Sequence, residues 1–169
     1  MAQLFVISAP SGTGKTSLIH KVLETELASK TKLGVSCTTR ERRENEEEGV
    51  AYFFLNEDAF NKKLDEGNFL EHAKVFGNLY GTPKDWVVST ISQGFDVVLE
   101  LDVQGAIQVK NAYPEAKTIF IIPPSYKDLE KRLVNRDQDS QETIEKRLSE
   151  AKQEVLSGKD FDHLITNDN

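Results

Sequence analysis

The segment APSGTGKT at residues 9–16 constrains the chain more than any other part of the sequence. It follows a short apolar run, LFVI, and precedes a stretch of helical spacing that begins near Ser17. In the pattern G-x-x-x-x-G-K-[ST], glycines bring backbone N–H groups close to an anion, and the following helix N-terminus adds partial positive charge. We therefore predict a phosphate-binding loop between a strand and a helix. Lys15 is predicted to reach the β- and γ-phosphates of a nucleotide, and the Thr16 hydroxyl to bind Mg²⁺.

The loop departs from the strict pattern at its first position, where Ala9 replaces glycine. Alanine is compatible with that position if its φ is negative, because glycine is needed only at positive φ. The alternative interpretation is an ordinary strand-to-helix turn with a surface lysine. The register of Gly12, Gly14, Lys15 and Thr16 after a strand and before a helix argues against it.

The length and charge of the chain limit the classes of protein it can belong to. Its 169 residues, 38% of them hydrophobic, are enough for one domain with a real core. The formal net charge of −7 disfavours nucleic acid as a partner and favours a small phosphorylated ligand. A single cysteine, Cys37, cannot form an internal disulfide, and the sequence shows neither a signal-peptide pattern nor a membrane-length apolar run. We therefore expect a cytoplasmic protein that binds neither nucleic acid nor membranes.

Hydrophobic spacing predicts strands and helices that alternate along most of the chain. Strands are expected at residues 3–8, 33–39, 52–55, 69–76, 79–80, 95–102, 117–122 and 161–166. Helices are expected at residues 17–27, 56–64, 82–94, 104–112, from 125 and from 139. Gly77 and Asn78 are predicted to form a hairpin turn, and Thr82 and Pro83 to be the N-cap and first residue of a helix. The alternation indicates an α/β fold on a parallel sheet.

The strand at residues 95–102 becomes acidic at its C-terminal end, where parallel α/β sheets place their ligands. Because strand side chains alternate, Glu100 and Asp102 are predicted to point to the same face. Two carboxylates there can hold Mg²⁺ or accept hydrogen bonds from a base or ribose. A phosphate-binding loop needs such an acid as its partner.

Other polar side chains have two interpretations when they are taken one by one. The basic stretch RERR at residues 40–43 can clamp a phosphate, but four glutamates follow within residues 44–48, so charge alone favours a solvated loop. Glu71 and Tyr80 lie among apolar neighbours, where they can face a polar ligand or simply the rim of the core.

Three arginines are predicted on the two helices after residue 125. Arg132 and Arg136 are four residues apart and therefore share a face, and Arg147 projects from the next helix. Such residues are usually solvated. Above a phosphate site they form a lid that neutralises phosphoryl charge and excludes water.

Several segments match, in order, those of guanylate kinases, which transfer the γ-phosphoryl group of ATP to GMP. After the loop come SCTTR at residues 36–40, FLEHA at 69–73, GNLYGT at 77–82 and LELDVQG at 99–105. The pattern R-L-x-x-R-x-x-D-S-x-x-x-I-x-x-R-L follows at 132–148, and ITND at 165–168. The chain thus resembles the guanylate kinase family over essentially its whole length.

The resemblance implies a P-loop core interrupted by two smaller units. The core is expected at residues 1–33, 83–125 and 157–169, with flanking helices. A β-rich insert that binds the nucleoside monophosphate is expected at residues 34–82, and a helical lid at 126–156.

The resemblance also implies a role for each matching residue. The expected ATP contacts are Ala9, Pro10, Ser11, Gly12, Thr13, Gly14, Lys15, Thr16, Ser17 and, beside the adenine, Asn167. The expected GMP contacts are Ser36, Arg40, Arg43, Tyr52, Glu71, Tyr80, Thr82, Glu100 and Asp102. The expected catalytic residues are Lys15, Arg43, Arg132, Arg136 and Arg147, and the expected Mg²⁺ ligands are Thr16 and Asp102. Glu71 and Thr82 are expected to read guanine, because adenine lacks the N1–H and 2-amino donors that a carboxylate accepts.

The sequence departs from the family pattern at several positions. Asp137 replaces a glycine after the second lid arginine, which places a negative charge beside phosphate-binding groups. Residues 42–48 lack the usual proline and glycine, so we expect the loop that carries Arg43 to be more mobile. The family normally continues into a further helix beyond the position of Asn169.

Two alternatives to a guanylate kinase stay open. One is a kinase of another nucleoside monophosphate, from which Glu71 and Thr82 distinguish the chain. The other is a non-catalytic binding module of the same fold. Such modules degrade the phosphate-binding loop, which is intact in this sequence.

Overall fold

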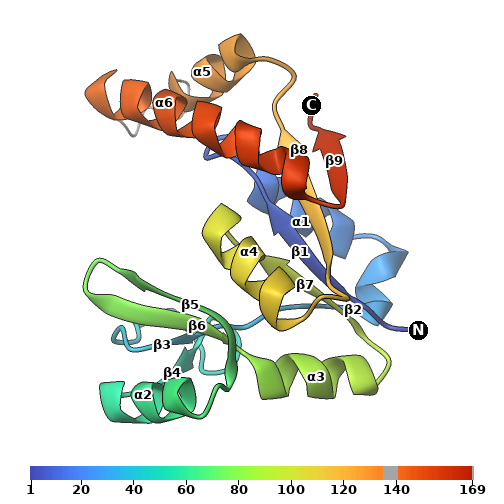
Figure 1. Cartoon of the computed structure of the whole chain (residues 1–169), viewed down its shortest axis with the longest axis vertical. Coiled ribbons are helices and arrows are strands. Elements are labelled where there is room, and N and C mark those ends of the chain that lie inside the picture. The colour runs from blue at the N-terminus through green and yellow to red at the C-terminus, as the bar shows by residue number, and fades with distance from the viewer. Residues whose placement is uncertain (135–140, 169) are drawn as a thin grey trace.

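A five-stranded parallel sheet forms the centre of the molecule (Figure 1). The computed structural model describes residues 1–134 and 141–168, and the side chains of the same ranges except 141–144. The sheet has the order β2-β7-β1-β8-β9, and every neighbouring pair is parallel. Its strands are β1 Leu4–Ser8, β2 Thr31–Leu33, β7 Asp96–Glu100, β8 Lys117–Ile122 and β9 His163–Thr166. The predicted α/β fold with a parallel sheet is therefore confirmed.

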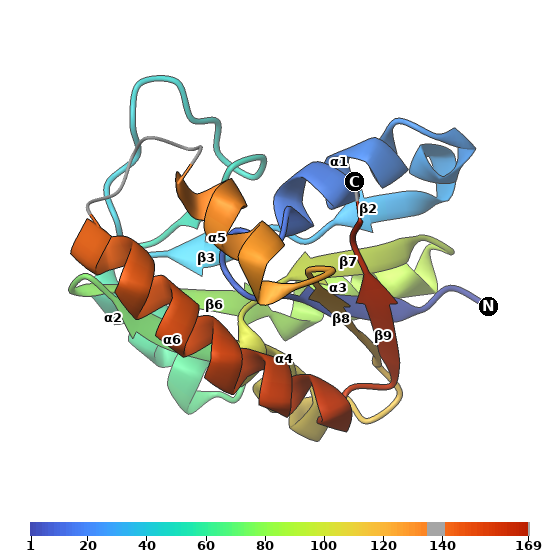
Figure 2. The ribbon, with the colours of Figure 1, turned by 90° about the horizontal axis from the view of Figure 1, so that it is seen from above.

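Helices cover both faces of this sheet. Helix α1, Lys15–Leu23, lies on one face, and α4, Val103–Ala112, lies on the other (Figure 2). Helix α3, Lys84–Ser92, contributes Val87 to the same core as Leu4 and Val6 of β1 and Val109 of α4. Because these four side chains are at most 1% exposed, that core fixes β1, and with it the start of the loop that follows the strand.

A second, four-stranded sheet lies at one end of the molecule (Figure 1). Its order is β4-β3-β6-β5, and its strands are β3 Cys37–Thr38, β4 Phe53–Phe54, β5 Phe69–Val75 and β6 Asn78–Pro83. Helix α2, Glu57–Asp65, packs against it through Phe60, which shares a small core with Cys37 and Phe69. The side chain of Asn56 caps this helix by accepting from the Ala59 N–H.

A helical pair lies at the opposite end of the molecule from the second sheet (Figure 1). It consists of α5, Tyr126–Val134, and α6, Gln141–Ser157, and the 3₁₀ turns η1, Glu26–Lys30, and η2, Gly158–Asp160, complete the fold. Leu129, Leu133 and Ala151 hold the two helices together. At the start of α5 the Asp128 N–H donates to Ser125 Oγ, so Ser125 caps this helix.

Several predicted boundaries are wrong. Helix α1 ends at Leu23 rather than Leu27, because Thr25 begins the 3₁₀ turn η1 by accepting from the Leu27 N–H. Thr82 and Pro83 belong to β6 and not to a helix, because the Thr82 hydroxyl donates to Glu71 instead of capping. The tight turn of the β5–β6 hairpin is at residues 76–77, one residue earlier than predicted.

None of the helices in the described part of the chain is long and apolar enough to cross a membrane.

Candidate active site

The loop at residues 9–16 joins β1 to α1 and has the backbone that its glycines predict. Gly12 and Gly14 have φ of 88° and 91°, which other residues rarely adopt. Phe76 is the only non-glycine residue with positive φ in the described ranges, so Ala9 has the negative φ that makes its methyl group tolerable. Helix α1 begins at Lys15, immediately after Gly14, so its unpaired N–H groups face the loop.

Lys15 and Thr16 reach from the loop to the C-terminal end of β7. The Lys15 Nζ donates to the backbone oxygen of Leu101 at 2.8 Å and lies 4.0 Å from Glu100 Oε1. The Thr16 hydroxyl donates to the same Glu100 oxygen at 2.5 Å. Burial lowers the pKa of Lys15, and the nearby carboxylates Glu100, Asp102 and Glu154 oppose that shift. The loop and the acidic corner predicted from sequence are therefore one site.

The predicted arrangement of Glu100 and Asp102 on one strand face is wrong. Strand β7 ends at Glu100, and Asp102 is the N-cap of α4, where its Oδ1 accepts from the Gly105 N–H at 2.7 Å. The need to cap α4 ends the strand before Asp102, and simple alternation therefore fails. The two carboxylates consequently line different cavities.

The corner at residues 100–102 separates two cavities. The first, of about 330 Å³, is lined by the loop, Lys15, Thr16, Asp102 and Glu154. The second, of about 160 Å³, is lined by Ser36, Tyr52, Thr82, Glu100 and neighbouring residues. Because Lys15 and Thr16 contact this corner from the first cavity while Glu100 lines the second, a group held in one is close to a group held in the other.

A buried carboxylate–hydroxyl pair is formed by Glu71 and by Thr82, which lines the second cavity. The Thr82 hydroxyl donates to Glu71 Oε1 at 2.6 Å, and the two residues are 1% and 7% exposed. Burial raises the pKa of Glu71, and the bond from Thr82 opposes that shift. The structure thus brings together the two residues predicted to read a base.

Arg40 lies between aromatic rings and a glutamate at the edge of the second sheet. Its guanidinium is 5.5 Å from the ring centroid of Tyr52 and donates to Glu46 Oε1 at 2.6 Å, and the ring of Tyr80 packs edge-on against Tyr52 at 5.8 Å between centroids. Glu46 also accepts from the backbone N–H of Arg43 at 2.9 Å, and these bonds lower the pKa of its carboxyl group. Arg40, Tyr52 and Tyr80 are therefore together, whereas the Arg43 side chain is exposed.

Of the arginines predicted to form a lid, Arg132 contacts the phosphate-binding loop, and Arg147 lies farther along the chain on α6. Arg132 donates to the backbone oxygens of Thr13 at 3.1 Å and Asn167 at 3.0 Å, and Asn167 Nδ2 donates to Thr13 O at 2.8 Å. Arg147 is half-buried on α6. Arg136 lies outside the described residues, as does Asp137.

Sequence reasoning missed two glutamates of the site. Glu46 lies in the acidic run that suggested a solvated loop, and its pairing with Arg40 depends on the fold of that loop. Glu154 lines the loop cavity from α6. The available signal was its place seven residues after Arg147, which puts both on one face of a helix.

The comparison with known proteins decides the family. The family model described as guanylate kinase matches residues 1–169. The chain belongs to the guanylate kinase family. A guanylate kinase of Hydrogenovibrio crunogenus is 51% identical over 164 residues, covering 97% of this chain and 79% of the relative. One of Hahella chejuensis is 49% identical over 166 residues, covering 98% of this chain and 79% of the relative.

The fold agrees with a solved guanylate kinase. The crystal structure of the guanylate kinase from Anaplasma phagocytophilum aligns with a TM-score of 0.68 at 29% identity. The alignment covers 99% of this chain and 78% of that one. Membership of the guanylate kinase family supports guanylate kinase activity.

Proposed function

We propose that this protein transfers the γ-phosphoryl group of ATP to GMP, with ATP phosphates in the loop cavity and GMP in the second cavity. The observation that carries the proposal is the corner at residues 100–102, which both cavities share. Transfer requires donor and acceptor oxygens roughly in line, and two cavities that meet at a lysine and a carboxylate can provide that arrangement. The reaction belongs to purine nucleotide metabolism in the cytoplasm.

In the loop cavity, backbone N–H groups of residues 9–17 and the ammonium of Lys15 bind the phosphates. Asn167 lies next to Gly14 and Thr13, where it can contact the adenine side of the nucleotide. Arg132 and Arg147, together with Arg136, neutralise charge that develops on the transferred group. Little covalent chemistry falls to the protein, because positioning and charge stabilisation account for most of this kind of catalysis.

In the second cavity, Glu71 and Thr82 read the guanine, and Arg40, Arg43, Tyr52, Tyr80 and Ser36 bind the phosphate. The Glu71 carboxylate accepts hydrogen bonds that guanine offers and adenine lacks, so AMP leaves a buried carboxylate unpaired. Glu100 and Asp102 lie beside GMP, the phosphoryl acceptor. The pairing of Arg40 with Glu46 supports the phosphate role, because it shows the guanidinium binding an anionic oxygen at this place.

The residues beside Thr16 fit a magnesium ion. Hydroxyl and carboxylate oxygens are the ligands that Mg²⁺ prefers, and Thr16, Glu100 and Asp102 supply them around the loop. Bound with ATP, Mg²⁺ neutralises charge on the β- and γ-phosphates. Thr16 and Asp102 are the ligands that we propose.

The proposal includes motion of two units around the core. We propose that residues 34–82 close over GMP and that the lid at residues 126–156 closes over ATP. Closure excludes water and so prevents wasteful hydrolysis of ATP.

The test measures ADP release from ATP with GMP, AMP, UMP or CMP as the acceptor. GMP is expected to be the fastest acceptor. Lys15→Met keeps the side-chain length but removes the ammonium, and it is expected to lower turnover about 10²–10³-fold or more. Lys21→Met, an exposed change on the same helix, is the matched control and should keep full activity.

Two outcomes would contradict the proposal. Near-normal turnover by Lys15→Met would remove the loop from the mechanism. A higher kcat/KM for AMP than for GMP would make the acceptor assignment wrong while leaving the kinase class in place.

A further inference from the structure

A third cavity lies between the second sheet and the core and is larger than the two already described. Its volume is about 720 Å³, compared with about 330 Å³ and 160 Å³ for the loop cavity and the second cavity. Sites for small organic molecules are typically about 300–1,000 Å³ in volume. We call it the rear cavity, and its walls include Lys32, Cys37, Phe53, Trp86 and Phe95. The proposed transfer of a phosphoryl group uses none of these residues.

The rear cavity and the second cavity lie on opposite faces of the same strands. Successive side chains of a strand point to opposite faces. Three pairs of neighbouring residues, on or next to β3, β4 and β6, have one member in each cavity. In each pair the first residue lines the second cavity and the next lines the rear cavity: Ser36 and Cys37, Tyr52 and Phe53, Thr82 and Pro83. The strands that are proposed to hold GMP are therefore the wall between the two cavities.

Both connections between the core and the second sheet pass the rear cavity. One runs from β2 to β3 through residues 34–36, and the other leaves β6 at Pro83 and enters α3 at Lys84. Helices α2 and α3 lie at the same end of the molecule (Figure 1), and Lys63 of α2 is 3.3 Å from the Asp85 carboxylate of α3. A molecule in this cavity therefore contacts the second sheet and the core at once.

The walls of the rear cavity combine aromatic rings with a positive charge. Phe53, Trp86 and Phe95 come from three different segments, and all three are only partly buried. The Lys32 ammonium is 4.9 Å from the centroid of the Phe95 ring, and the described residues offer it no carboxylate partner for an ion pair. Aromatic walls favour a planar ring system, and a lysine beside them favours an anionic group on that ring.

We propose that the rear cavity binds a planar aromatic carboxylic acid and that its binding strengthens the binding of GMP. The rings of the ligand lie among Phe53, Trp86 and Phe95, and its carboxylate pairs with Lys32. The site depends only on the geometry of the rear cavity, whereas the coupling rests on the proposed place of GMP.

The sign of the coupling follows from the shared wall. When the strands tilt away from the second cavity, they move into the rear cavity and make it smaller. A ligand behind Cys37 and Phe53 prevents that tilt and so keeps Ser36 and Tyr52 close to GMP. Because GMP and the ligand favour the same position of the strands, each should tighten the binding of the other by the same factor.

The test uses the fluorescence of Trp86, which is the only tryptophan of the chain and lines the rear cavity. Biphenyl-4-acetate is the probe, and biphenyl-4-acetamide is its neutral match. The acetate should shift the Trp86 emission to shorter wavelength with a Kd of about 0.3 mM, as expected for a ligand of this size. The acetamide should bind about 3- to 5-fold more weakly, because it cannot form the ion pair with exposed Lys32.

Variants test whether the probe occupies the rear cavity. Lys32→Met should weaken binding of the acetate about 3- to 5-fold and leave binding of the acetamide unchanged. Lys30→Met, an exposed change two residues earlier, is the matched control and should bind both probes like the wild type. Ser89→Phe places a ring in the cavity from the exposed side of α3 and should weaken both probes more than tenfold. Thermal unfolding checks that each variant is folded.

The coupling is measured by calorimetry with GMP. Saturating GMP should tighten binding of the acetate about fivefold, at the lower end of typical coupling between sites, and the acetate should tighten GMP by the same factor. Ser89→Phe should bind GMP with or without the acetate equally well.

The outcomes separate the site, the coupling and the proposed function. Equal acetate binding by the wild type, Lys32→Met and Ser89→Phe, or no emission shift at all, would overturn the site. Competition between GMP and the acetate would contradict their placement on opposite faces, and unchanged GMP affinity would overturn the coupling. Failure of the wild type to bind GMP would contradict the proposed function, while the Trp86 titration would still decide whether the rear cavity binds the acid.

Discussion

A bulge at the start of β5 directs the Glu71 carboxylate toward Thr82, in the proposed base site. The register with β6 pairs Phe69 with Pro83 and Glu71 with Thr82, so Leu70 is the extra residue. The side chains at 69–71 are all at most 9% exposed, which strict alternation on a two-faced strand does not allow. Phe69 packs in the second-sheet core, Leu70 in the main core, and Glu71 against Thr82.

The first prediction concerns the acceptor specificity that Glu71 confers. Glu71→Gln replaces an acceptor of two hydrogen bonds with an amide that presents one donor toward guanine. We expect kcat/KM for GMP to fall about 100-fold, while the value for AMP changes less than about threefold. Steady-state ADP release with both acceptors measures the two ratios. Equal losses for GMP and AMP would mean that Glu71 supports the fold rather than reading the base.

The same carboxylate predicts a pH dependence. Only the ionised form accepts both hydrogen bonds, and burial raises the pKa of Glu71, so protonation begins closer to neutral pH than for an exposed glutamate. The KM for GMP should therefore rise as pH falls from about 8 to 5. Because the GMP phosphate also titrates, the ratio of wild-type to Glu71→Gln values is compared, and this ratio should move toward 1 at low pH.

At the scale of single residues, the sequence identified the groups whose chemistry is tied to a local pattern. Lys15 and Thr16 follow from the loop motif, and Glu71 was singled out as a carboxylate among apolar neighbours. Glu46 and Glu154 were missed because their surroundings, Arg40 for Glu46 and the loop cavity for Glu154, are set by loop and helix packing. The local sequence around a charged residue on a helix or in an acidic run does not indicate which groups will lie next to it in the fold.

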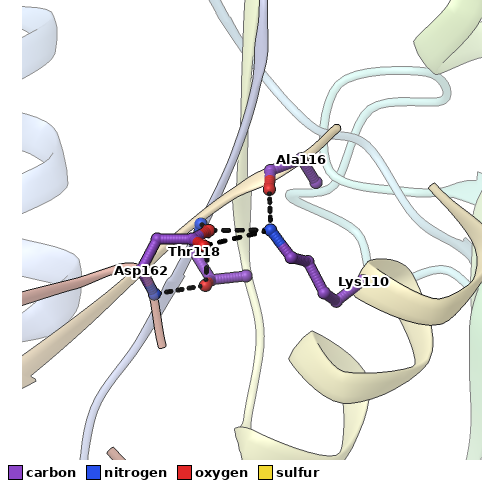
Figure 3. Close-up of polar contacts among 4 residues, drawn as sticks. All are labelled: Lys110, Ala116, Thr118 and Asp162. Atoms are coloured by element: carbon purple, nitrogen blue, oxygen red, sulfur yellow. Dashed lines mark hydrogen bonds and ion pairs between the residues drawn. The ribbon is translucent and has the colours of Figure 1, made fainter. Parts of the chain in front are cut away.

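A polar network joins α4, the start of β8 and the residue just before β9 (Figure 3). Asp162, just before β9, accepts from Lys110 Nζ of α4 at 2.9 Å and from the Thr118 N–H of β8 at 2.8 Å. Lys110 also donates to the backbone oxygen of Ala116 at 2.8 Å, and the Asp162 N–H donates to the Thr118 hydroxyl at 2.9 Å. The network fixes where β9 begins, and β9 leads directly to Asn167.

A further prediction is that this network contributes measurably to stability. Asp162→Asn removes the charge from an acceptor of several bonds, and we expect the free energy of unfolding to fall by about 1–2 kcal/mol at pH 7. This is the range for hydrogen bonds to a charged group, reduced because the Asp162 side chain is 35% exposed. Urea unfolding measures it. Asp160→Asn, an exposed change two residues earlier, is the control and should stay within about 0.5 kcal/mol.

The difference between wild type and Asp162→Asn should also depend on pH. Lys110 and the Thr118 N–H hold the pKa of Asp162 well below its usual range. A depressed folded-state pKa gives stability that is complete above the unfolded value of about 3.9 and is lost as pH falls toward the folded value. The gap in unfolding free energy should therefore be constant from pH 7 to 5 and shrink below about pH 4. A gap that grows on acidification would contradict the assignment.

At the scale of elements, the strands and helices of the core were predictable. The wrong boundaries lie where a polar side chain forms a hydrogen bond that its local sequence does not indicate. Residues 117–122 form a strand with the predicted bounds because the run is mostly apolar and is followed directly by Pro123 and Pro124. Thr82 looked like an N-cap, but its hydroxyl is used by Glu71 eleven residues earlier. Asp102 looked like a strand residue, but it caps α4. A local sequence pattern shows which residues can cap a helix, but it does not show which group each of them will bond in the fold.

At the scale of the whole molecule, the second sheet is attached to the core along one edge. Strand β5 is the edge of its sheet, and an edge strand presents unpaired N–H and C=O groups. Gln108 of α4 pairs with both, because its Oε1 accepts from the His72 N–H at 3.1 Å and its Nε2 donates to the His72 oxygen at 3.3 Å. Leu70, 2% exposed in the main core, adds apolar packing next to these bonds.

This attachment limits how the proposed closure over GMP can occur. The β5 edge is held to α4 by both polar and apolar contacts, whereas Arg40 and Glu46 lie on the opposite side of the sheet, in the long connection between β3 and β4. The segment around residues 40–50 can therefore move toward GMP while Glu71 stays in place. Hydrophobic patterning predicted the strands of this sheet, but it contained no information on which edge of the sheet would be covered.

The last prediction tests this attachment with Gln108→Ala. The variant removes both bonds to His72, each worth about 0.5–1.5 kcal/mol and less at a solvated edge, so amide exchange at His72 should become about tenfold faster. Because β5 carries Glu71, the KM for GMP should rise about threefold while ADP affinity stays unchanged. Gln104→Ala, an exposed change one turn earlier on α4, is the control and should alter neither value. Unchanged amide exchange at His72 in Gln108→Ala would contradict this role of Gln108. It would show that the packing of Leu70 alone holds the β5 edge against α4.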